Sequence, residues 1–361
     1  MRRLRLDPGS ARLAFYLIAL VAVQTLISAI VPQRDLAVGQ IIGWRRLLGQ
    51  DNRVITALWL DRIYYSPLFL ASLALLGVNL LTGNLRRFRT VLKVERTLLR
   101  ARHLGSIVFH LAILVVIAGV LLNNLYRFRG VLGVTEGQTV RDVPADYVRL
   151  STGYLRRDAV GRYSLTLDRL DRNRLIGDAA TEEATVTLHP SDGGPPVAGP
   201  VRVNHPLRWG GLEFHMGSRP GYSPEVVVQD ADRRPLYRRF VRLKVAARGQ
   251  EKVHEDYFML PDGKTMVGVN LIPSDRDPGV VDRRLTVKRS EAVLFEGPLA
   301  AGDTLAVADL RITIPRVRNW CYLQVEGNPM LWMVFSGFWL GLGGLAISVV
   351  ARVKNRREKR S

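Results

Sequence analysis

The chain has 361 residues, of which 47% are hydrophobic, and a formal net charge of +20 at pH 7. Its single cysteine, Cys321, leaves no CxxC dithiol motif and no CxxCH haem-attachment motif. This excludes a dithiol oxidoreductase that acts alone and a c-type cytochrome. We expect Cys321 to be an incidental buried thiol.

Four apolar stretches have the length of a membrane-spanning helix, which needs about 17–25 mainly apolar residues. They are Leu13–Val31, Pro67–Gly83, Leu104–Leu122 and Met330–Val350. The first is too long for the core of a signal peptide, and Pro32 follows it without a clear small-x-small cleavage site. We interpret it as a retained anchor. The sequence therefore predicts a polytopic α-helical membrane protein with four transmembrane helices.

Basic residues gather beside these stretches, on one side of a four-helix topology. They lie before the first stretch, after the fourth, and in a loop over residues 84–103 that contains Arg86, Arg87, Arg89, Lys93, Arg96, Arg100 and Arg102. Because cytoplasmic loops carry an excess of Lys and Arg, we expect both termini to be cytoplasmic. Most of the positive charge is thus topological, which favours contact with anionic membrane lipid and argues against nucleic acid as a partner.

This topology divides the chain into five segments. They are a cytoplasmic N-terminus with the first helix (1–31), a short outer loop (32–66), the second and third helices (67–125), a large outer domain (126–328) and the fourth helix with a basic tail (329–361). The short loop is amphipathic and is expected to lie along the membrane surface. Its apolar residues are Trp44, Leu47, Leu48, Ile55, Leu58 and Trp59.

The outer domain is predicted to be mainly β. Short runs rich in β-branched or alternating apolar residues are separated by Gly, Pro and Asp clusters. The runs are Tyr163–Leu167, Ala184–Leu188, Pro200–Val203, Glu225–Val228, Arg242–Val245, Leu285–Val287 and Leu310–Ile314. A segment of this length can bury a core as one or two β domains, so we expect a sandwich or a split barrel.

His110 is the leading candidate for a functional residue, because it lies inside the third apolar stretch. Ionisable residues at membrane depth are costly and usually functional, and histidine ligates metals near neutral pH. His103 lies seven residues earlier, on the same face of a helix and about 10 Å away along its axis. That separation is too long for both to ligate one haem iron. Since the other three stretches contain no histidine, an opposing ligand would come from the outer domain or another polypeptide.

The alternative is a packing role for His110, as a buried histidine hydrogen-bonded to a neighbouring helix, for example to Gln24 or Asn79. The fourth stretch contains Gly337, Gly341, Gly343 and Gly344, a small-residue pattern that allows close helix packing. This packing could be within the chain or against a partner.

The outer domain holds a second, weaker candidate group. His205 follows Asn204, His215 lies between Phe214 and Met216, and Gly210-Gly211 between them suggests a hairpin that would bring the two histidines near each other. The competing interpretation is two surface histidines in loops. No HExxH or similar zinc pattern is present, and we assign no catalytic acid or base.

The order of several segments resembles the ResB/CcsB family of cytochrome c biogenesis, system II. Those segments are Ile30–Gln33, Ile63–Phe69, Leu76–Leu81, Arg86–Phe88, His103–Gly105, Phe109–Leu111 with Gly119, Val201–Pro206, Gly210–Phe214 and Asn328-Pro329. The resemblance covers most of the chain, although the outer domain is compact for the family.

The resemblance implies a function. With a CcsA/ResC-type membrane partner, such proteins move haem b across the bacterial cytoplasmic membrane and attach it outside to the CxxCH thiols of apocytochrome c, alongside a thiol reductant of the thioredoxin type. The family's transmembrane histidine corresponds to His110, as an axial ligand of haem iron, and His103 is a weaker correspondence. The six tryptophans form no cluster of the partner's kind, so the chain resembles one half of a split haem lyase, a non-catalytic or co-catalytic subunit.

Two other functions remain open from the residues. A b-type electron-transfer subunit would use His103 and His110 for two haems. A non-haem membrane anchor or scaffold would bind a protein through its β domain.

Overall fold

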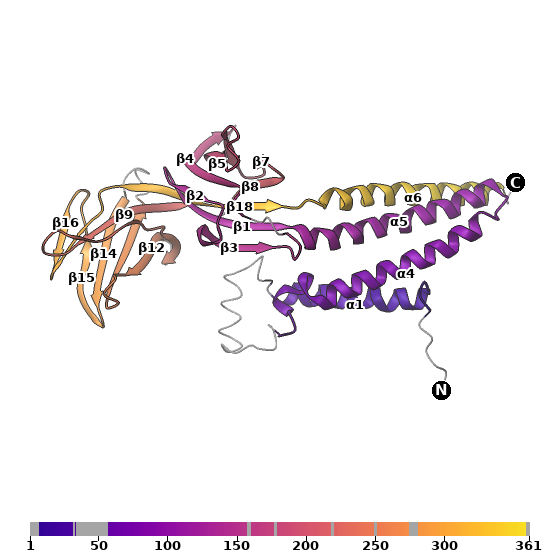
Figure 1. Cartoon of the computed structure of the whole chain (residues 1–361), viewed down its shortest axis with the longest axis horizontal. Helices are drawn as coiled ribbons and strands as arrows, with labels where there is room; N and C mark the ends of the chain where they lie inside the picture. Colours follow the sequence, from indigo (N-terminus) through magenta and orange to yellow (C-terminus); the bar gives the residue numbers. More distant parts are fainter. Residues whose placement is uncertain are drawn as a thin grey trace. The chain divides into compact units, whose positions relative to one another are not determined.

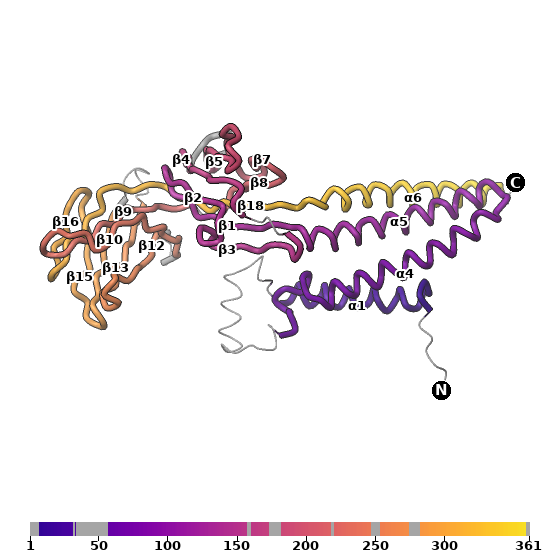
Figure 2. The backbone as a smooth tube through the Cα atoms, viewed as in Figure 1, coloured from indigo at the N-terminus to yellow at the C-terminus, as the bar shows by residue number. Residues whose placement is uncertain are grey.

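The computed structural model describes residues 7–31, 33, 57–156, 160–176, 179–217, 220–248, 251–273 and 281–358. The chain forms two compact units (Figures 1 and 2). A helical unit comprises Met1–Arg127, Gly153–Arg156 and Asn328–Ser361, and a β unit comprises Phe128–Thr152 and Arg157–Gly327.

Four long helices make up the helical unit: α1 (Ala11–Ile30), α4 (Pro67–Val91), α5 (Thr97–Tyr126) and α6 (Leu331–Glu358). Each is long and apolar enough to cross a membrane. They confirm the four predicted helices and correct their ends. The helices α4, α5 and α6 extend into the flanking basic segments, because Arg and Lys are good helix formers and a polar sequence does not end a helix.

Local capping fixes the starts of α1 and α4. The Ser10 hydroxyl accepts a hydrogen bond from the Leu13 amide at 3.2 Å, and the Ser66 hydroxyl accepts one from the Phe69 amide at 3.1 Å. Pro67 occupies the first turn of α4, where its missing N–H costs nothing.

Gln33 joins the end of α1 to the 3₁₀ helix η1 (Leu60–Tyr65). Its amide nitrogen donates to the Val31 and Leu60 carbonyls, and its amide oxygen accepts from the Ile63 amide. Of the predicted interfacial loop, Trp44, Leu47, Leu48 and Ile55 lie outside the described residues. Leu58 is exposed and Trp59 is half-buried, and the location of this loop along the membrane surface stays a prediction.

Small residues let α5 and α6 pack closely. A Cβ added to Gly105 of α5 would lie 2.6 Å from the Ser348 nitrogen, and one added to Gly344 of α6 would lie 2.7 Å from the Phe109 nitrogen. Gly337 is equally tight, 2.9 Å from the Ala112 carbonyl oxygen. Of the four glycines that the sequence left open between internal packing and a partner, Gly337 and Gly344 thus serve internal packing of α6 on α5, whereas Gly343 meets no atom within 4 Å.

Buried polar side chains join the remaining helices. The Gln24 amide of α1 donates to the Ser72 hydroxyl of α4 at 3.2 Å, and the Asn79 amide donates to the Ser10 carbonyl at 3.3 Å. Asn84 of α4 donates to the Ile107 carbonyl of α5 at 3.3 Å. Each bond satisfies a group that is costly to bury alone.

The β unit is built from antiparallel sheets. The largest has nine strands: β1 (Phe128–Thr135), β3 (Tyr147–Thr152), β7 (Leu207–Trp209), β8 (Leu212–Met216), β9 (Gly221–Gln229), β10 (Pro235–Phe240), β16 (Thr304–Val307), β17 (Leu310–Thr313) and β18 (Val317–Gly327). A four-stranded sheet has the order β2-β4-β5-β6, with β2 (Thr139–Arg141), β4 (Tyr163–Ile176), β5 (Ala179–Pro190) and β6 (Val197–Arg202). A five-stranded sheet runs in chain order through β11 (Lys244–Arg248), β12 (Glu251–Met259), β13 (Thr265–Pro273), β14 (Val281–Arg289) and β15 (Ala292–Pro298).

Two hydrophobic cores lie against the large sheet. One contains Phe128, Leu323 and Val325 of the large sheet with Leu165 and Val186 of the four-stranded sheet. The other joins Val226 and Ile312 of the large sheet to Val267, Val269 and Leu285 of the five-stranded sheet. The expected sandwich is therefore present twice, with the large sheet as the layer common to both.

The strands confirm the predicted β runs, with three differences at their ends. The run predicted from Arg242 begins as strand β11 at Lys244, and β6 and β17 each end one residue before the predicted Val203 and Ile314. Cys321 is fully buried in β18, as expected for an inert thiol. Because the surrounding strands exclude water, burial raises the pKa of its thiol to about 12.

Candidate functional site

His110 lies on the face of α5 that packs toward α4. Its Nδ1 is 2.6 Å from the Ser106 carbonyl oxygen, one helical turn earlier. A carbonyl only accepts hydrogen bonds, so Nδ1 carries the proton and donates it. In the neutral ring, the lone pair is therefore on Nε2. Metal-ligating histidines are commonly fixed in this way, with one nitrogen bonded to a carbonyl and the other turned toward the metal.

Arg87 of α4 occupies the Nε2 side of this ring. Its Nη1 lies 3.3 Å from Nε2 of His110. A guanidinium only donates, so this contact uses the lone pair that the Ser106 carbonyl leaves on Nε2. Arg87 and a metal ion would compete for the same pair of electrons.

Asn84 sets the separation of the two helices at this level. Its buried amide nitrogen donates to the Ile107 carbonyl, one turn of α5 before His110 and about one turn of α4 before Arg87. The Asn84 Oδ1 atom is buried without a hydrogen-bond partner in the structure. This close approach of α4 and α5 is what allows Arg87 to reach His110.

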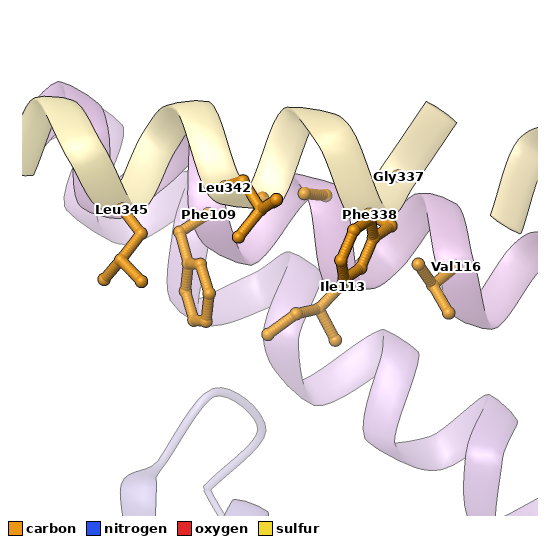
Figure 3. Close-up of a pocket in the computed structure, with 9 residues that line it drawn as sticks. Phe109, Ile113, Val116, Gly337, Phe338, Leu342 and Leu345 are labelled. Atoms are coloured by element: carbon orange, nitrogen blue, oxygen red, sulfur yellow. The ribbon is translucent and has the colours of Figure 1, made fainter. Parts of the chain in front are cut away.

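An apolar groove between α5 and α6 begins beside the histidine. The Phe109 ring meets the His110 ring edge-on, with centroids 5.7 Å apart. Figure 3 shows Phe109 and Ile113 of α5 and Phe338 and Leu342 of α6 lining this groove, which has a volume of about 240 Å³. The groove presents no polar group to a ligand and fits an apolar occupant.

In the structure the neighbouring-helix partner of His110 differs from the two examples that the packing alternative named. Gln24 bonds to Ser72 and Asn79 bonds to the Ser10 carbonyl, so neither is the partner of the histidine. Its partners are the Ser106 carbonyl and Arg87. His103 is exposed on α5 and makes no hydrogen bond or ion pair within the described part of the chain.

In the β unit, the hairpin predicted around Gly210-Gly211 is confirmed. Trp209 of β7 pairs with Leu212 of β8, and both glycines have positive φ, 55° and 76°, as a tight two-residue turn requires. The Nε2 atom of His215 of β8 lies 3.3 Å from a carboxylate oxygen of Glu213.

Asn204 and His205 lie in a separate turn that follows β6. Asn204 has a φ of 61°, which asparagine tolerates, and His205 exchanges backbone hydrogen bonds with Arg202. His205 is exposed, and no hydrogen bond, ion pair or ring contact joins its side chain to His215 among the described residues. The hairpin is present, and the approach of the two histidines stays a prediction.

The β unit also buries a histidine that the sequence did not single out. His254 of β12 is 3% exposed, meets the Tyr222 ring edge-on at 4.8 Å, and has an Nδ1 atom without a partner. Desolvation, followed by the positive charge of Arg172, lowers its pKa to about 4. It is therefore neutral near neutral pH.

No cluster of three or more His, Cys, Asp or Glu side chains suited to a metal ion occurs among the described residues. The opposing ligand that the sequence analysis expects for His110 therefore stays a prediction.

Arg87 is the site residue that the sequence analysis missed, because it counted this residue only as topological charge. The missed signal is the short turn between α4 and α5. Two antiparallel helices joined there pack side by side, with Asn84 of α4 beside Ile107 of α5, and the long side chain at position 87 then reaches position 110.

Most of the chain matches a known protein family. A family model described as the ResB-like family matches residues 11–98 and 99–357. No curated protein gave a significant match. Among solved structures, one titled "Cytochrome c Heme Lyase CcmF" is similar over 83% of this chain, with 13% identity and a TM-score of 0.31. The present chain covers 35% of the length of that structure.

Proposed function

Because this chain belongs to the ResB-like family, we propose that it is a membrane subunit of cytochrome c biogenesis. With a CcsA-type partner it would deliver haem b to the outer side of the bacterial cytoplasmic membrane. There the complex would attach haem to the CxxCH thiols of apocytochrome c. Haem is the cargo of this process.

The observation that supports the proposal best is the state of His110. The Ser106 carbonyl holds its Nδ1 proton, which leaves the Nε2 lone pair as a ready ligand for iron. This hydrogen bond orients the imidazole ring and fixes which of its two nitrogens carries the proton. In this role His110 would be an axial ligand during haem transfer, and His103 would lie one layer closer to the cytoplasm.

The opposing axial ligand would come from the partner. The helices α1, α4 and α6 contain no histidine, so the helical unit offers no second imidazole across from His110. A split lyase in which each half supplies one ligand would bind haem only when both halves meet. That arrangement would limit the release of free haem in the membrane.

We assign the β unit the task of holding apocytochrome c. Asn204, His205 and His215 are candidate contacts at its surface and in the hairpin. A thiol reductant of the thioredoxin type would keep the CxxCH thiols reduced, since Cys321 is buried and unreactive. We assign no catalytic acid or base to this chain, so it acts as a non-catalytic or co-catalytic subunit.

The four membrane-capable helices support a location in the membrane. The basic ends of α4, α5 and α6 would lie on the cytoplasmic side, with the β unit on the outer side. Anionic lipid would then contact the basic clusters.

Complementation measures this function directly. A strain that lacks the gene would receive the wild-type chain or His110→Ala, and c-type cytochromes would be counted by their covalent haem in gels. We expect His110→Ala to lose most of the cytochrome c at unchanged protein abundance. His103→Ala is the matched control on the same helix face, and it should have the smaller effect.

Each alternative gives a different result in this experiment. A b-type electron-transfer subunit would leave cytochrome c maturation normal in the deletion strain while membrane haem b falls. A non-haem scaffold would tolerate His110→Ala and fail only when the β unit is removed.

A further inference from the structure

Arg87 stands out among the cations beside the helices. Within the described chain it has one polar side-chain partner, the His110 ring, and no acidic partner. Its neighbour Arg86, by contrast, forms a bidentate pair with Asp7, with both N–O distances at 2.9 Å. The positive charge of Arg87 is therefore not compensated by a carboxylate of its own chain.

We propose that Arg87 binds a carboxylate of the porphyrin that His110 ligates, and so selects a porphyrin with free propionates. This inference rests on the proposed function, because it adds a residue to the same site. In this role Arg87 is a positioning residue, which orients the haem by binding its propionate carboxylates.

The first step of the argument is competition at Nε2. A metal–imidazole bond is about 2 Å long and uses the Nε2 lone pair. The guanidinium now 3.3 Å from that atom uses the same lone pair, so it must move when a metal arrives. The site thus exchanges one partner of His110 for another and releases Arg87 in the same event.

The second step is the fate of the released charge. An unpaired cation next to an apolar helix pair is costly, and a guanidinium binds a carboxylate strongly through two parallel N–H···O bonds. The long, flexible arginine stem lets the charged end move along the helix surface while α4 stays in place. A metal porphyrin of the haem type brings both groups at once, a metal at its centre and carboxylates at its edge.

The third step concerns the position of α4. The Asn84–Ile107 hydrogen bond holds α4 against α5 about one turn from Arg87 and His110. Since this bond involves neither residue, it can persist while Arg87 changes partners. Arg87 therefore stays tethered near any ligand bound to His110.

A lipid phosphate offers the same chemistry as a propionate, so the test must separate the two. The full-length chain would be placed in nanodiscs of phosphatidylcholine, which has no net charge. The probes are zinc protoporphyrin IX and its dimethyl ester, followed by fluorescence titration. Zinc porphyrins take a single axial ligand, so His110 can be tested without the partner that supplies the opposing ligand.

We expect the wild-type chain to bind the free acid about tenfold or more tightly than the ester. Arg87→Gln should bind the two probes equally, and it should bind the ester at least as well as the wild type, because the competitor for Nε2 is gone. Arg87→Lys should keep part of the preference, since it keeps the charge. Arg89→Gln is the matched control, an exposed cation two residues away on α4, and it should keep the full preference.

The inference is overturned if Arg87→Gln retains the wild-type preference for the free acid. It is also overturned if anionic phosphatidylglycerol in the nanodiscs removes the preference of the wild type for the free acid, which would make lipid phosphate the ligand of Arg87. Failure of the proposed function is distinct: His110→Ala would then bind both probes as tightly as the wild type. Size-exclusion elution of each variant at the wild-type position shows that a lost preference is not a loss of fold.

Discussion

The Nε2 atom of His110 and the Nη1 atom of Arg87 lie 3.3 Å apart, across the packed helices α5 and α4. The Ser106 carbonyl fixes the opposite side of the same ring at 2.6 Å. The imidazole thus has a hydrogen-bond acceptor at Nδ1 and a donor at Nε2. A metal that binds Nε2 can displace the Arg87 guanidinium, whereas the Ser106 carbonyl belongs to the helix backbone and stays in place.

Asn84 is predicted to control this geometry from one turn away. Asn84→Leu removes one buried hydrogen bond, and it also removes the unpartnered Oδ1 atom, so the net loss of stability should be about 1 kcal/mol or less. Asn84→Asp keeps the shape but buries a carboxylate against the Ile107 carbonyl, and should cost several-fold more. Thermal unfolding in detergent measures both. Equal losses in the two variants would show that Asn84 is not buried as described.

Two adjacent glycines of α6 give a matched test of helix packing. Gly344→Ala places a Cβ 2.7 Å from the Phe109 nitrogen, so α5 and α6 must separate, at a cost of about 1–3 kcal/mol. Gly343→Ala meets no atom within 4 Å and should be neutral or stabilising by up to about 1 kcal/mol, because alanine favours helix. The thermal midpoint should fall in Gly344→Ala and stay unchanged or rise in Gly343→Ala. A loss in Gly343→Ala equal to that in Gly344→Ala contradicts the helix register.

Cys321 is predicted to be unreactive in the folded chain. A thiol with a pKa of about 12 instead of 9.0 holds roughly a thousandfold less thiolate at neutral pH, and full burial blocks reagents as well. A maleimide–polyethylene glycol reagent should label the native protein very slowly and label it completely in dodecyl sulfate. Cys321→Ala should leave cytochrome c maturation near wild type. Rapid labelling of native protein would contradict the burial.

His254 predicts a pH dependence of the β unit. Its folded pKa, about 4, lies below the ordinary value of 6.5, so the unfolded chain takes up a proton first as the pH falls. The stabilising effect of the neutral ring is complete above about pH 6.5 and is lost progressively down to about pH 4. The loss should reach at most about 3 kcal/mol relative to His254→Leu. Amide exchange of β12 in both proteins over this range measures it, and parallel pH profiles would rule out a role for His254.

Much of the helical unit could be predicted from the sequence, because membrane-spanning length and apolarity are strong signals. The ends of the helices were less accessible, since basic residues such as Arg87 and Arg102 continue a helix without adding to its hydropathy. The β runs were visible from alternation and turn residues. Their pairing was not, because β1 and β18 are far apart in the sequence and only tertiary packing joins them.

The candidate site could also be predicted only in part from the sequence. His110 was evident as an ionisable residue in an apolar stretch. Gln24 and Asn79, the partners suggested for its ring, were wrong. Gln24 bonds to Ser72 and Asn79 bonds to the Ser10 carbonyl, and the sequence does not show these contacts between α1 and α4. Arg87 was hidden because a cation beside a membrane helix has a general explanation, and only the packing of α4 on α5 gives it a particular one. The roles assigned to His103, Asn204, His205 and His215 stay predictions.

The most direct test of the central claim is the absorption spectrum of the detergent-purified chain, co-expressed with its CcsA-type partner, for wild type and His110→Ala. The account predicts a Soret band in the wild-type complex, a large decrease in His110→Ala, and recovery when imidazole is added to replace the missing ligand. An unchanged haem content and spectrum in His110→Ala would contradict it, and would make His110 a packing residue in a scaffold whose partner handles haem alone.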